Sequence, residues 1–177
     1  PQAAAAVESA LAGVSAQNDR GEGALRRVSL DVRRGEMLGI AGVAGNGQRE
    51  LAEVIVGLRR VLVGTVRISG ADVTHASPET VIRLGVSYVP EDRQGMGLVP
   101  NASILDNLLL KAYRMPPLAR GPFLNYGQAA TEARRLLATF AMNELRLGAS
   151  VGSLSGGNQQ RLLLARELAT HPSLLIV

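Results

Sequence analysis

The chain has 177 residues, 46% of them hydrophobic but only 3% aromatic, so its core must come from aliphatic side chains, which suits one α/β domain better than a β-sandwich. Its net charge of +4 is spread along the sequence, and the lack of aromatic stacking platforms and of a local basic cluster argues against a nucleic-acid partner. The absence of cysteine excludes disulfides and thiolate metal sites, and the absence of a signal-peptide layout or a ~20-residue apolar run predicts an intracellular, soluble domain.

The sequence up to residue 58 is expected to contain a linker, two strands and a helix. The first 23 residues, rich in Ala, Gly and Ser, are expected to be a linker or an irregular domain entry. From Arg26 onward hydrophobic and polar residues alternate, which predicts a strand with one buried face that ends in a turn at Arg34–Glu36. Met37–Ala41 is a continuous apolar run, typical of a fully buried parallel strand. A helix is predicted over 48–58 because four apolar residues share one face: Leu51, Val54, Ile55 and Leu58.

Residues 65–100 are expected to hold a hairpin, a short helix and a further strand. The stretch "TVRIS" (65–69) followed by "GAD" (70–72) is typical of an edge hairpin. Ser77 and Pro78 predict the start of a short helix that Gly85 ends, since Pro suits the first helical position and Gly the C-terminal cap. The apolar "VSYV" (86–89) predicts another strand.

The block from about 101 to 152 is predicted to be a helical subdomain inserted into the α/β core, because no strand signal interrupts residues 101–150. One helix begins after Pro100, where Ser103 and Asp106 have capping-box spacing, and a second helix covers 128–142. A later helix is predicted over 158–170, followed by a break at Pro172 and an apolar strand up to Val177. The nucleotide-binding domain described below is expected to cover residues 24–177.

The stretch "GVAGNGQRE" (42–50) has the glycine spacing of a phosphate-binding loop between a predicted strand and a predicted helix. Such a loop works because backbone N–H groups converge on phosphate at a helix N-terminus, while a Lys and a Ser or Thr hydroxyl serve the outer phosphates and magnesium. Here the last two positions are Gln48 and Arg49, so the backbone cradle is kept and the side-chain chemistry is lost. The alternative is a tight turn in which Arg49 pairs with Glu53. The candidate phosphate-binding residues are Gly42, Gly45, Asn46, Gly47, Gln48 and Arg49.

A second glycine motif, "LSGGNQQ" (154–160), precedes a predicted helix and forms another possible anion-binding helix start. Together with "GVAGNGQRE", it makes the chain resemble the nucleotide-binding domain of ABC transporters, whose signature sequence is "LSGG". This resemblance implies an α/β P-loop NTPase core with an inserted helical subdomain. It also implies that the signature contacts ATP bound by a partner domain, through Ser155, Gly156, Gly157 and Gln159.

The stretch "VSYVPEDRQGMGLVP" (86–100) carries a finer resemblance. ABC domains usually have a Gln after this strand that senses magnesium and the attacking water, and Glu91 stands at or near that position. The "PEDR" box is similar to the second, degenerate ATP-binding half of importers for simple sugars and nucleosides, and this makes Glu91 the candidate catalytic residue. The alternative is a solvated turn closed by a local ion pair among Glu91, Asp92 and Arg93.

Two departures from the family pattern are visible in the sequence. No aromatic residue precedes Tyr88, so the expected adenine-stacking aromatic upstream of the P-loop is missing. The chain is also expected to be a fragment, truncated at the strand that would carry the catalytic acids, because the residues expected next after Val177 are those acids. Neither His75 nor His171 is placed to substitute for the family's switch histidine.

The resemblance implies an ATP-binding subunit that couples ATP hydrolysis to uptake of a sugar or nucleoside, although the isolated fragment is expected to be inactive. The implied cofactors are ATP and, in the assembled protein, Mg²⁺, with weak or no magnesium binding at this P-loop and no metal ligand assigned. The implied partners are a second ABC domain in the same polypeptide, transmembrane permease subunits and, indirectly, a substrate-binding protein, at the cytoplasmic face of the membrane. One alternative is a non-catalytic regulatory half. Another, a soluble ABC protein acting on ribosomes or DNA, is disfavoured by the "PEDR" box.

Overall fold

The computed structural model describes residues 6–43, 45–113, 118–120 and 123–177. The chain divides into two compact units. The first contains the residues up to Tyr88 together with Pro172–Ile176, and the second contains Val89–His171 and Val177. No helix among the described residues is both long enough and apolar enough to span a bilayer. Each unit has a hydrophobic core of its own.

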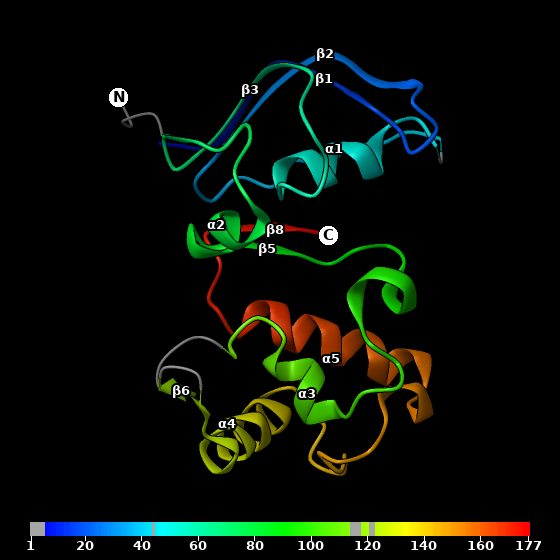
Figure 1. Cartoon of the computed structure of the whole chain (residues 1–177), viewed down its shortest axis with the longest axis vertical. Coiled ribbons are helices and arrows are strands. Elements are labelled where there is room, and N and C mark those ends of the chain that lie inside the picture. Colours follow the sequence, from blue (N-terminus) through cyan, green and yellow to red (C-terminus); the bar gives the residue numbers. More distant parts are fainter. Residues whose placement is uncertain (1–5, 44, 114–117, 121–122) are drawn as a thin grey trace. The chain divides into compact units, whose positions relative to one another are not determined.

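The first unit is built around a four-stranded sheet with the order β2-β1-β3-β4 (Figure 1). Its strands are β1 (Val7–Gln17), β2 (Gly23–Arg33), β3 (Val63–Ile68) and β4 (Ala71–Asp72), and all neighbours are antiparallel. The strand expected from Arg26 is therefore present as β2, and the hairpin expected at 65–72 is present as β3 and β4. The hairpin is an edge feature only on its β4 side, because β3 also pairs with β1.

Within residues 1–23, expected to be a linker or an irregular domain entry, Val7–Gln17 instead forms the strand β1 between β2 and β3. Leu11, Val14 and Ala16 of β1 are buried in the core of the first unit. Leu11 stands opposite Leu30 of β2 and Val66 of β3. The Ala and Gly residues of β1 have low intrinsic strand preference, so the strand is stabilised by packing and pairing with strands distant in sequence.

Helix α1 (Gln48–Ile55) packs three apolar residues, Leu51, Val54 and Ile55, into the same core. The helix ends three residues earlier than expected, since Gly57 takes a positive φ of 76° and Leu58 is left exposed. The expected buried strand at Met37–Ala41 is absent: this segment has no strand assignment and Met37 is 96% exposed. A strand needs a hydrogen-bonding partner, and the described strands β5 and β8 pair only with each other.

The remaining elements of the first unit agree with the sequence pattern. Helix α2 (Pro78–Arg83) begins at Ser77, whose side chain accepts a hydrogen bond from the Thr80 amide, and ends before Gly85. The strand β5 (Val86–Tyr88) pairs in parallel with β8 (Leu174–Ile176). These two strands add Val86, Leu174 and Ile176 to the core of the first unit.

The second unit is mainly helical. It contains the π-helix η1 (Arg93–Gly97), α3 (Ile104–Leu109), α4 (Tyr126–Thr139), the 3₁₀ turn η2 (Val151–Ser153) and α5 (Gly156–Leu168). Ser103 caps α3 by accepting from the Asp106 amide at 3.0 Å, as its spacing predicts. The short hairpin of β6 (Ala119–Arg120) and β7 (Phe123–Leu124) was not expected from the sequence. The apolar faces of α3, α4 and α5 meet in one core around Ile104, Leu137 and Leu162.

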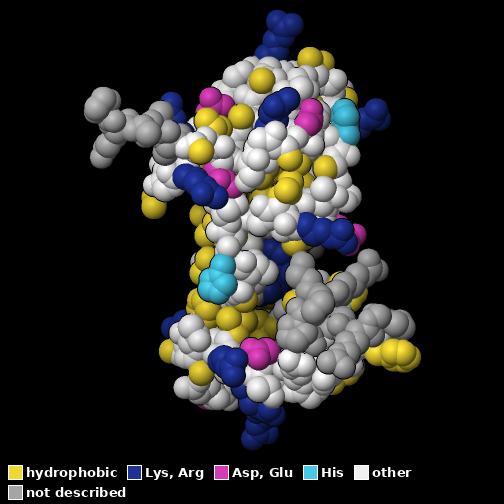
Figure 2. Space-filling view, turned by 90° about the vertical axis from the view of Figure 1, so that its left-hand side faces the viewer, with side chains coloured by type: hydrophobic (Ala, Val, Ile, Leu, Met, Phe, Trp, Pro, Cys, Tyr) yellow, Lys and Arg dark blue, Asp and Glu magenta, His cyan; other side chains and the backbone are white. Residues whose placement is uncertain are grey.

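Arg and Lys side chains are dispersed over both units on the face shown in Figure 2, without one continuous basic patch.

Candidate nucleotide-binding elements

The described residues of the loop before α1, 42–43 and 45–47, include two glycines that the backbone requires. Gly45 and Gly47 have φ values of 88° and 97°, which other residues rarely adopt. Gly47 is also buried against β2, where an added Cβ would lie 2.8 Å from the Ala24 carbonyl oxygen. The spacing that indicated a phosphate loop runs from Gly42 to Gly47, and of these two glycines only Gly47 has a positive φ.

The N-terminus of α1 is suited to an anion. Its N-cap residue, Gly47, makes no side-chain cap hydrogen bond, so no capping side chain covers the first amides of the helix. These amides carry the positive end of the helix dipole, equivalent to about half a charge. Asn46 is exposed, and its amide donates to the Val43 carbonyl at 3.2 Å. Phosphate binding by this loop stays a prediction.

The Gln48 side chain lies close over Gly42, because a Cβ added at Gly42 would overlap the Gln48 Nε2 atom. The amide thus occupies space inside the turn and offers no positive charge. Because this atom is the far end of a flexible side chain, the contact by itself does not require glycine at position 42.

Arg49 is held by carboxylates of its own unit. Its Nε donates to Glu53 Oε1 at 2.7 Å, and its Nη2 lies 3.4 Å from Asp19 Oδ2. Arg59 binds the same two acids, at 2.6 Å each. Hydrogen bonding from Arg59 lowers the pKa of Asp19, and bonding to Glu53 raises the pKa of Arg49. The i,i+4 pair expected under the alternative reading is therefore present, and Arg49 is a fixed cation where a magnesium-binding hydroxyl would be needed.

The signature motif forms the start of α5. Ser155 is its N-cap residue, and the Ser155 hydroxyl accepts from the Asn158 amide at 3.4 Å. Gly156 and Gly157 are exposed, and a Cβ added at either would meet no described atom within 4 Å. The fold of this chain does not require glycine at these two positions, but the absence of side chains keeps the helix N-terminus open to close approach by another molecule.

Gln159, expected to contact ATP, instead points into the second unit. It is 4% exposed, and its Nε2 donates to the carbonyls of Val151 at 3.2 Å and Leu154 at 3.3 Å. Its Oε1 accepts from Gln94 Nε2 at 3.2 Å. A contact between Gln159 and ATP stays a prediction, whereas the geometry gives this side chain a role in shaping the turn before α5.

The "PEDR" residues differ in what they contact. Glu91 is exposed, and Asp92 caps η1 by accepting from the Gly95 amide at 2.9 Å. Arg93 donates from Nη1 to the Gly156 carbonyl at 3.1 Å and to Gln160 Oε1 at 3.4 Å. The ion pairs found among the described residues do not join Arg93 to Glu91 or Asp92, so the local ion pair of the alternative reading is not formed. The sequence did not indicate that Arg93 reaches the signature, since 63 residues separate it from Gly156.

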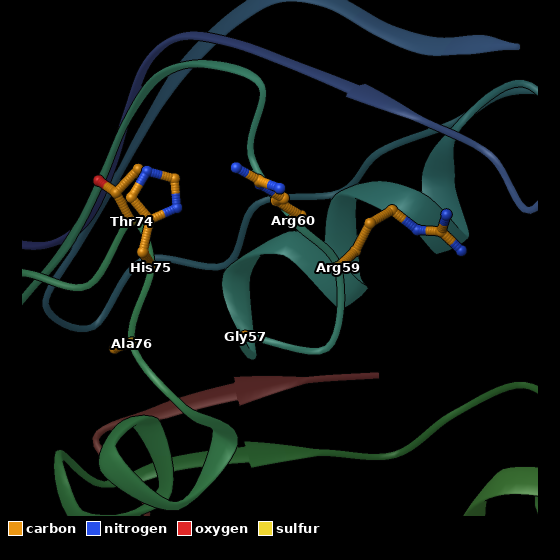
Figure 3. A pocket seen from close by; sticks show the side chains of 6 residues that line it. All are labelled: Gly57, Arg59, Arg60, Thr74, His75 and Ala76. Atoms are coloured by element: carbon orange, nitrogen blue, oxygen red, sulfur yellow. The ribbon is translucent and has the colours of Figure 1, made fainter. Parts of the chain in front are cut away.

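A cavity of about 420 Å³ lies at the opposite end of α1 from the glycine loop. It is lined by Gly57, Arg59, Arg60, Thr74, His75 and Ala76. In Figure 3 the Arg60 and His75 side chains extend toward one another, while Arg59 extends away from them. The cavity is thus distinct from the glycine loop, and none of the predicted site residues lines it.

A glycine loop before one helix and an "SGG" start of another define an ABC-type P-loop NTPase domain. The sequence pattern of the ABC transporter family matches residues 25–177, and the chain belongs to this family. The predicted membership and α/β P-loop fold are confirmed. The chain has a TM-score of 0.76 to the dimeric post-hydrolysis structure of an ATP-binding cassette bound to ADP and Pi, at 24% identity over 94% of this chain and 72% of the other. The TM-score to a nucleotide-free ATP-binding cassette from an ABC transporter is 0.75, at 22% identity over 96% of this chain and 68% of the other.

Three curated relatives are import ATP-binding proteins. A glucose import ATP-binding protein of Haloferax volcanii is 48% identical over 92% of this chain and 30% of its own length. A nucleoside import ATP-binding protein of Lactococcus lactis is 40% identical over 91% of the chain and 32% of its own length. A guanosine import ATP-binding protein of Bacillus subtilis is 36% identical over 94% of the chain and 33% of its own length. The chain thus spans about a third of the length of these relatives.

Proposed function

We propose that the chain forms the second, degenerate ATP-binding half of a protein that drives import of a simple sugar or nucleoside by hydrolysing ATP. The "PEDR" box and the printed functions of the relatives, glucose, nucleoside and guanosine import, support the substrate class. The proposed partners are a first ABC domain in the same polypeptide, transmembrane permease subunits and, indirectly, a substrate-binding protein. The proposed location is the cytoplasmic face of the membrane.

The observation that carries this proposal is the contrast between the two glycine motifs. At the P-loop, Gln48 lies over Gly42 and Arg49 is bound to Glu53, so neither supplies the phosphate-directed charge or the magnesium ligand of a complete loop. At the signature, Gly156 and Gly157 leave the start of α5 open. The two motifs serve different ATP molecules under this proposal, which allows one to lose its chemistry while the other keeps it.

In the assembled protein, Ser155 and the first amides of α5 stabilise the negative charge on the terminal phosphate of the ATP held by the other domain. Glu91 is the proposed residue near the attacking water. ATP brings the phosphoanhydride bond that is cleaved, and magnesium at the other domain's P-loop neutralises its phosphates. The start of α1 offers backbone N–H groups to a second nucleotide, while the side chain of Arg49 there is paired with Glu53.

A pair of substitutions in the full-length protein tests the assignment of the two motifs. Ser155→Arg is expected to abolish ATP hydrolysis, because it places a bulky cation in the open start of α5. Gln48→Ala is expected to keep most of the activity, because Gln48 belongs to the degenerate site. Steady-state ATPase rates of the two variants test this assignment. A larger loss of rate in Gln48→Ala than in Ser155→Arg would contradict the proposal.

Nucleotide titration tests the P-loop itself. We expect weak ATP binding by this chain that magnesium strengthens little, since each lost charge-assisted contact is worth roughly 1.5–3 kcal/mol, or about ten- to a hundredfold in affinity. Calorimetric titration with ATP, with and without magnesium, measures the affinity and its dependence on magnesium. The matched variant Gln48→Lys/Arg49→Ser should bind ATP more tightly and with magnesium dependence, yet should not hydrolyse it. Micromolar, strongly magnesium-dependent binding by the unaltered chain would refute the prediction.

The second candidate function is a regulatory half that does not catalyse. The ion pairs of Arg49 with Asp19 and Glu53 favour it, because they balance the charge of this arginine within the chain without a bound ligand. The residues that follow Val177 in the full-length protein discriminate between the candidates. An Asp-Glu pair there favours a working site, and its loss favours regulation.

A further inference from the structure

The segment from Arg93 to Gly97, which begins with the last residue of the "PEDR" box, contacts one side of α5. At the start of the helix, Arg93 donates to the Gly156 carbonyl at 3.1 Å and to Gln160 Oε1 at 3.4 Å. Gln94 donates to Gln159 at 3.2 Å. One turn further along the helix, Gly97 packs so closely that an added Cβ would lie 2.9 Å from Leu163 Cδ2. The contacted residues fall at intervals of three and four, so they share one helix face.

The same segment is held near the other end of α5 by a buried ionic network. Arg166, 8% exposed, donates from Nη2 to the Gly97 carbonyl at 2.7 Å and from Nε to Glu167 Oε1 at 3.0 Å. Lys111 of the segment after α3 binds the second oxygen of Glu167 at 2.6 Å. Breaking such a buried pair is costly, so the Gly97 end of the segment is firmly fixed.

We propose that Arg93 and Gln94 are positioning residues that hold the signature turn at the start of α5, so that the "PEDR" loop and the signature move as one body. This inference rests on the proposed function. It follows from which atoms are contacted: the Gly156 carbonyl belongs to the signature itself, and Gln159 is the side chain that ties the Val151 and Leu154 carbonyls to the helix.

The physical reason lies in the first turn of the helix. Ser155, Gly156 and Gly157 are exposed, and two glycines give this turn the largest backbone freedom of any residue pair. A guanidinium bonded to the Gly156 carbonyl and to Gln160 restricts that freedom without occupying the open face. Arg93 therefore acts through the signature backbone and does not need to touch the nucleotide.

Hydrogen exchange in the full-length protein tests the positioning directly. In Arg93→Ala, the amides of Asn158, Gln159 and Gln160 should exchange about five- to tenfold faster, because a charge-assisted hydrogen bond to their turn is lost. Arg93→Lys, which retains one donor to the carbonyl, should restore part of the protection. The control Arg135→Ala removes an exposed arginine of α4 and should leave these amides unchanged. Unchanged exchange in Arg93→Ala overturns the proposal, whatever the activity.

The kinetic consequence is measured on the same variants. Arg93→Ala should lower kcat for ATP hydrolysis about tenfold with KM changed less than about twofold and Tm within about 2 °C, since the signature acts on the transition state. Faster exchange with an unchanged kcat would show that the positioning by Arg93 does not contribute to ATP hydrolysis. A full-length protein that hydrolyses no ATP contradicts the proposed function, while the exchange result still decides whether Arg93 holds the turn.

Discussion

One carboxylate, Glu53, is shared by two arginines on opposite sides. Its side chain is 4% exposed, and it accepts from Arg49 at 2.7 Å and from Arg59 at 2.7 Å. The two arginines differ in burial, because the Arg59 side chain is 12% exposed and the Arg49 side chain 53% exposed. Arg59 also donates to the Gln17 carbonyl at 2.7 Å, which ties the segment after α1 to the end of β1.

The difference in burial predicts unequal effects on stability. Arg59→Ala should cost about 2–4 kcal/mol, because it leaves a buried carboxylate with one exposed partner. Arg49→Ala should cost less than about 1 kcal/mol, because water already screens that pair. Urea unfolding of both variants gives the comparison, with Arg83→Ala, which removes an exposed i,i+4 pair, as the control. Equal losses for Arg49 and Arg59 would contradict the assignment.

Contacts between residues close in sequence can be predicted from the sequence, whereas contacts between residues distant in sequence cannot. The Arg49–Glu53 pair follows from i,i+4 spacing alone and is present. The contacts of Arg59 with Asp19 and of Arg93 with Gly156 join residues 40 and 63 positions apart, and no local pattern encodes them. Of the candidate site, the sequence thus predicted the motifs and their helices. The hydrogen bonds that hold these motifs in place could be identified only from the structure.

Elements with local signals were also predicted where the structure has them. Ser77, Pro78 and Gly85 bracket α2 with a side-chain cap, a favourable first residue and a left-handed exit, all of which are encoded within ten residues. Strands lack such local determination. β1 was missed because its Ala- and Gly-containing sequence is stabilised by two partner strands. Met37–Ala41 was expected as a buried strand from its apolar side chains, but backbone pairing decides a strand and none of the described strands pairs with it.

The strand β1 carries a buried acid, Glu8, which is expected to make the sheet sensitive to low pH. The Ser69 hydroxyl donates to Glu8 Oε1 at 2.6 Å, and Arg34 Nε donates to Oε2 at 3.2 Å. These bonds favour the charged carboxylate and lower the pKa of Glu8. Because the folded-state pKa lies below the unfolded one, the stabilisation is present above the unfolded value of about 4.3 and is lost as pH falls through the lower folded value.

Thermal unfolding between pH 6 and pH 3 checks this consequence. The Tm of the unaltered chain should fall as Glu8 becomes protonated, and Glu8→Gln should show a lower Tm at pH 6 with a smaller decrease at acid pH. Glu79→Gln provides a control, since Glu79 is exposed and pairs only with Arg83 among the described residues. Parallel pH profiles for Glu8→Gln and the unaltered chain would show that this carboxylate does not govern the response.

At the scale of the whole molecule, the two units have separate hydrophobic cores. Ile68 is fully buried in the core of the first unit, and Leu162 is fully buried in the core of the second. Each core is assembled from the helices and strands of its own unit. Damage to one core should therefore be felt first within that unit.

A matched pair of cavity-forming variants tests this separation. Ile68→Ala and Leu162→Ala should each destabilise the affected unit by about 2–5 kcal/mol. Hydrogen exchange mapped along the chain should show lost protection mainly in β1–β3 for Ile68→Ala and mainly in α3–α5 for Leu162→Ala. Uniform loss over both units in either variant would indicate a single cooperative core instead.

The ionic network around Glu167 has a practical consequence for chemical labelling. Lys111 is the only lysine among the 177 residues, and its side chain is 12% exposed beside Glu167. An amine-reactive ester, which modifies unprotonated and accessible amines, should therefore modify this side chain slowly while the second unit stays closed. Apart from the amine at the start of a chain, Lys111 carries the only amine in this sequence, so mass spectrometry of the single peptide that contains it should show faster modification under conditions that open the helical unit.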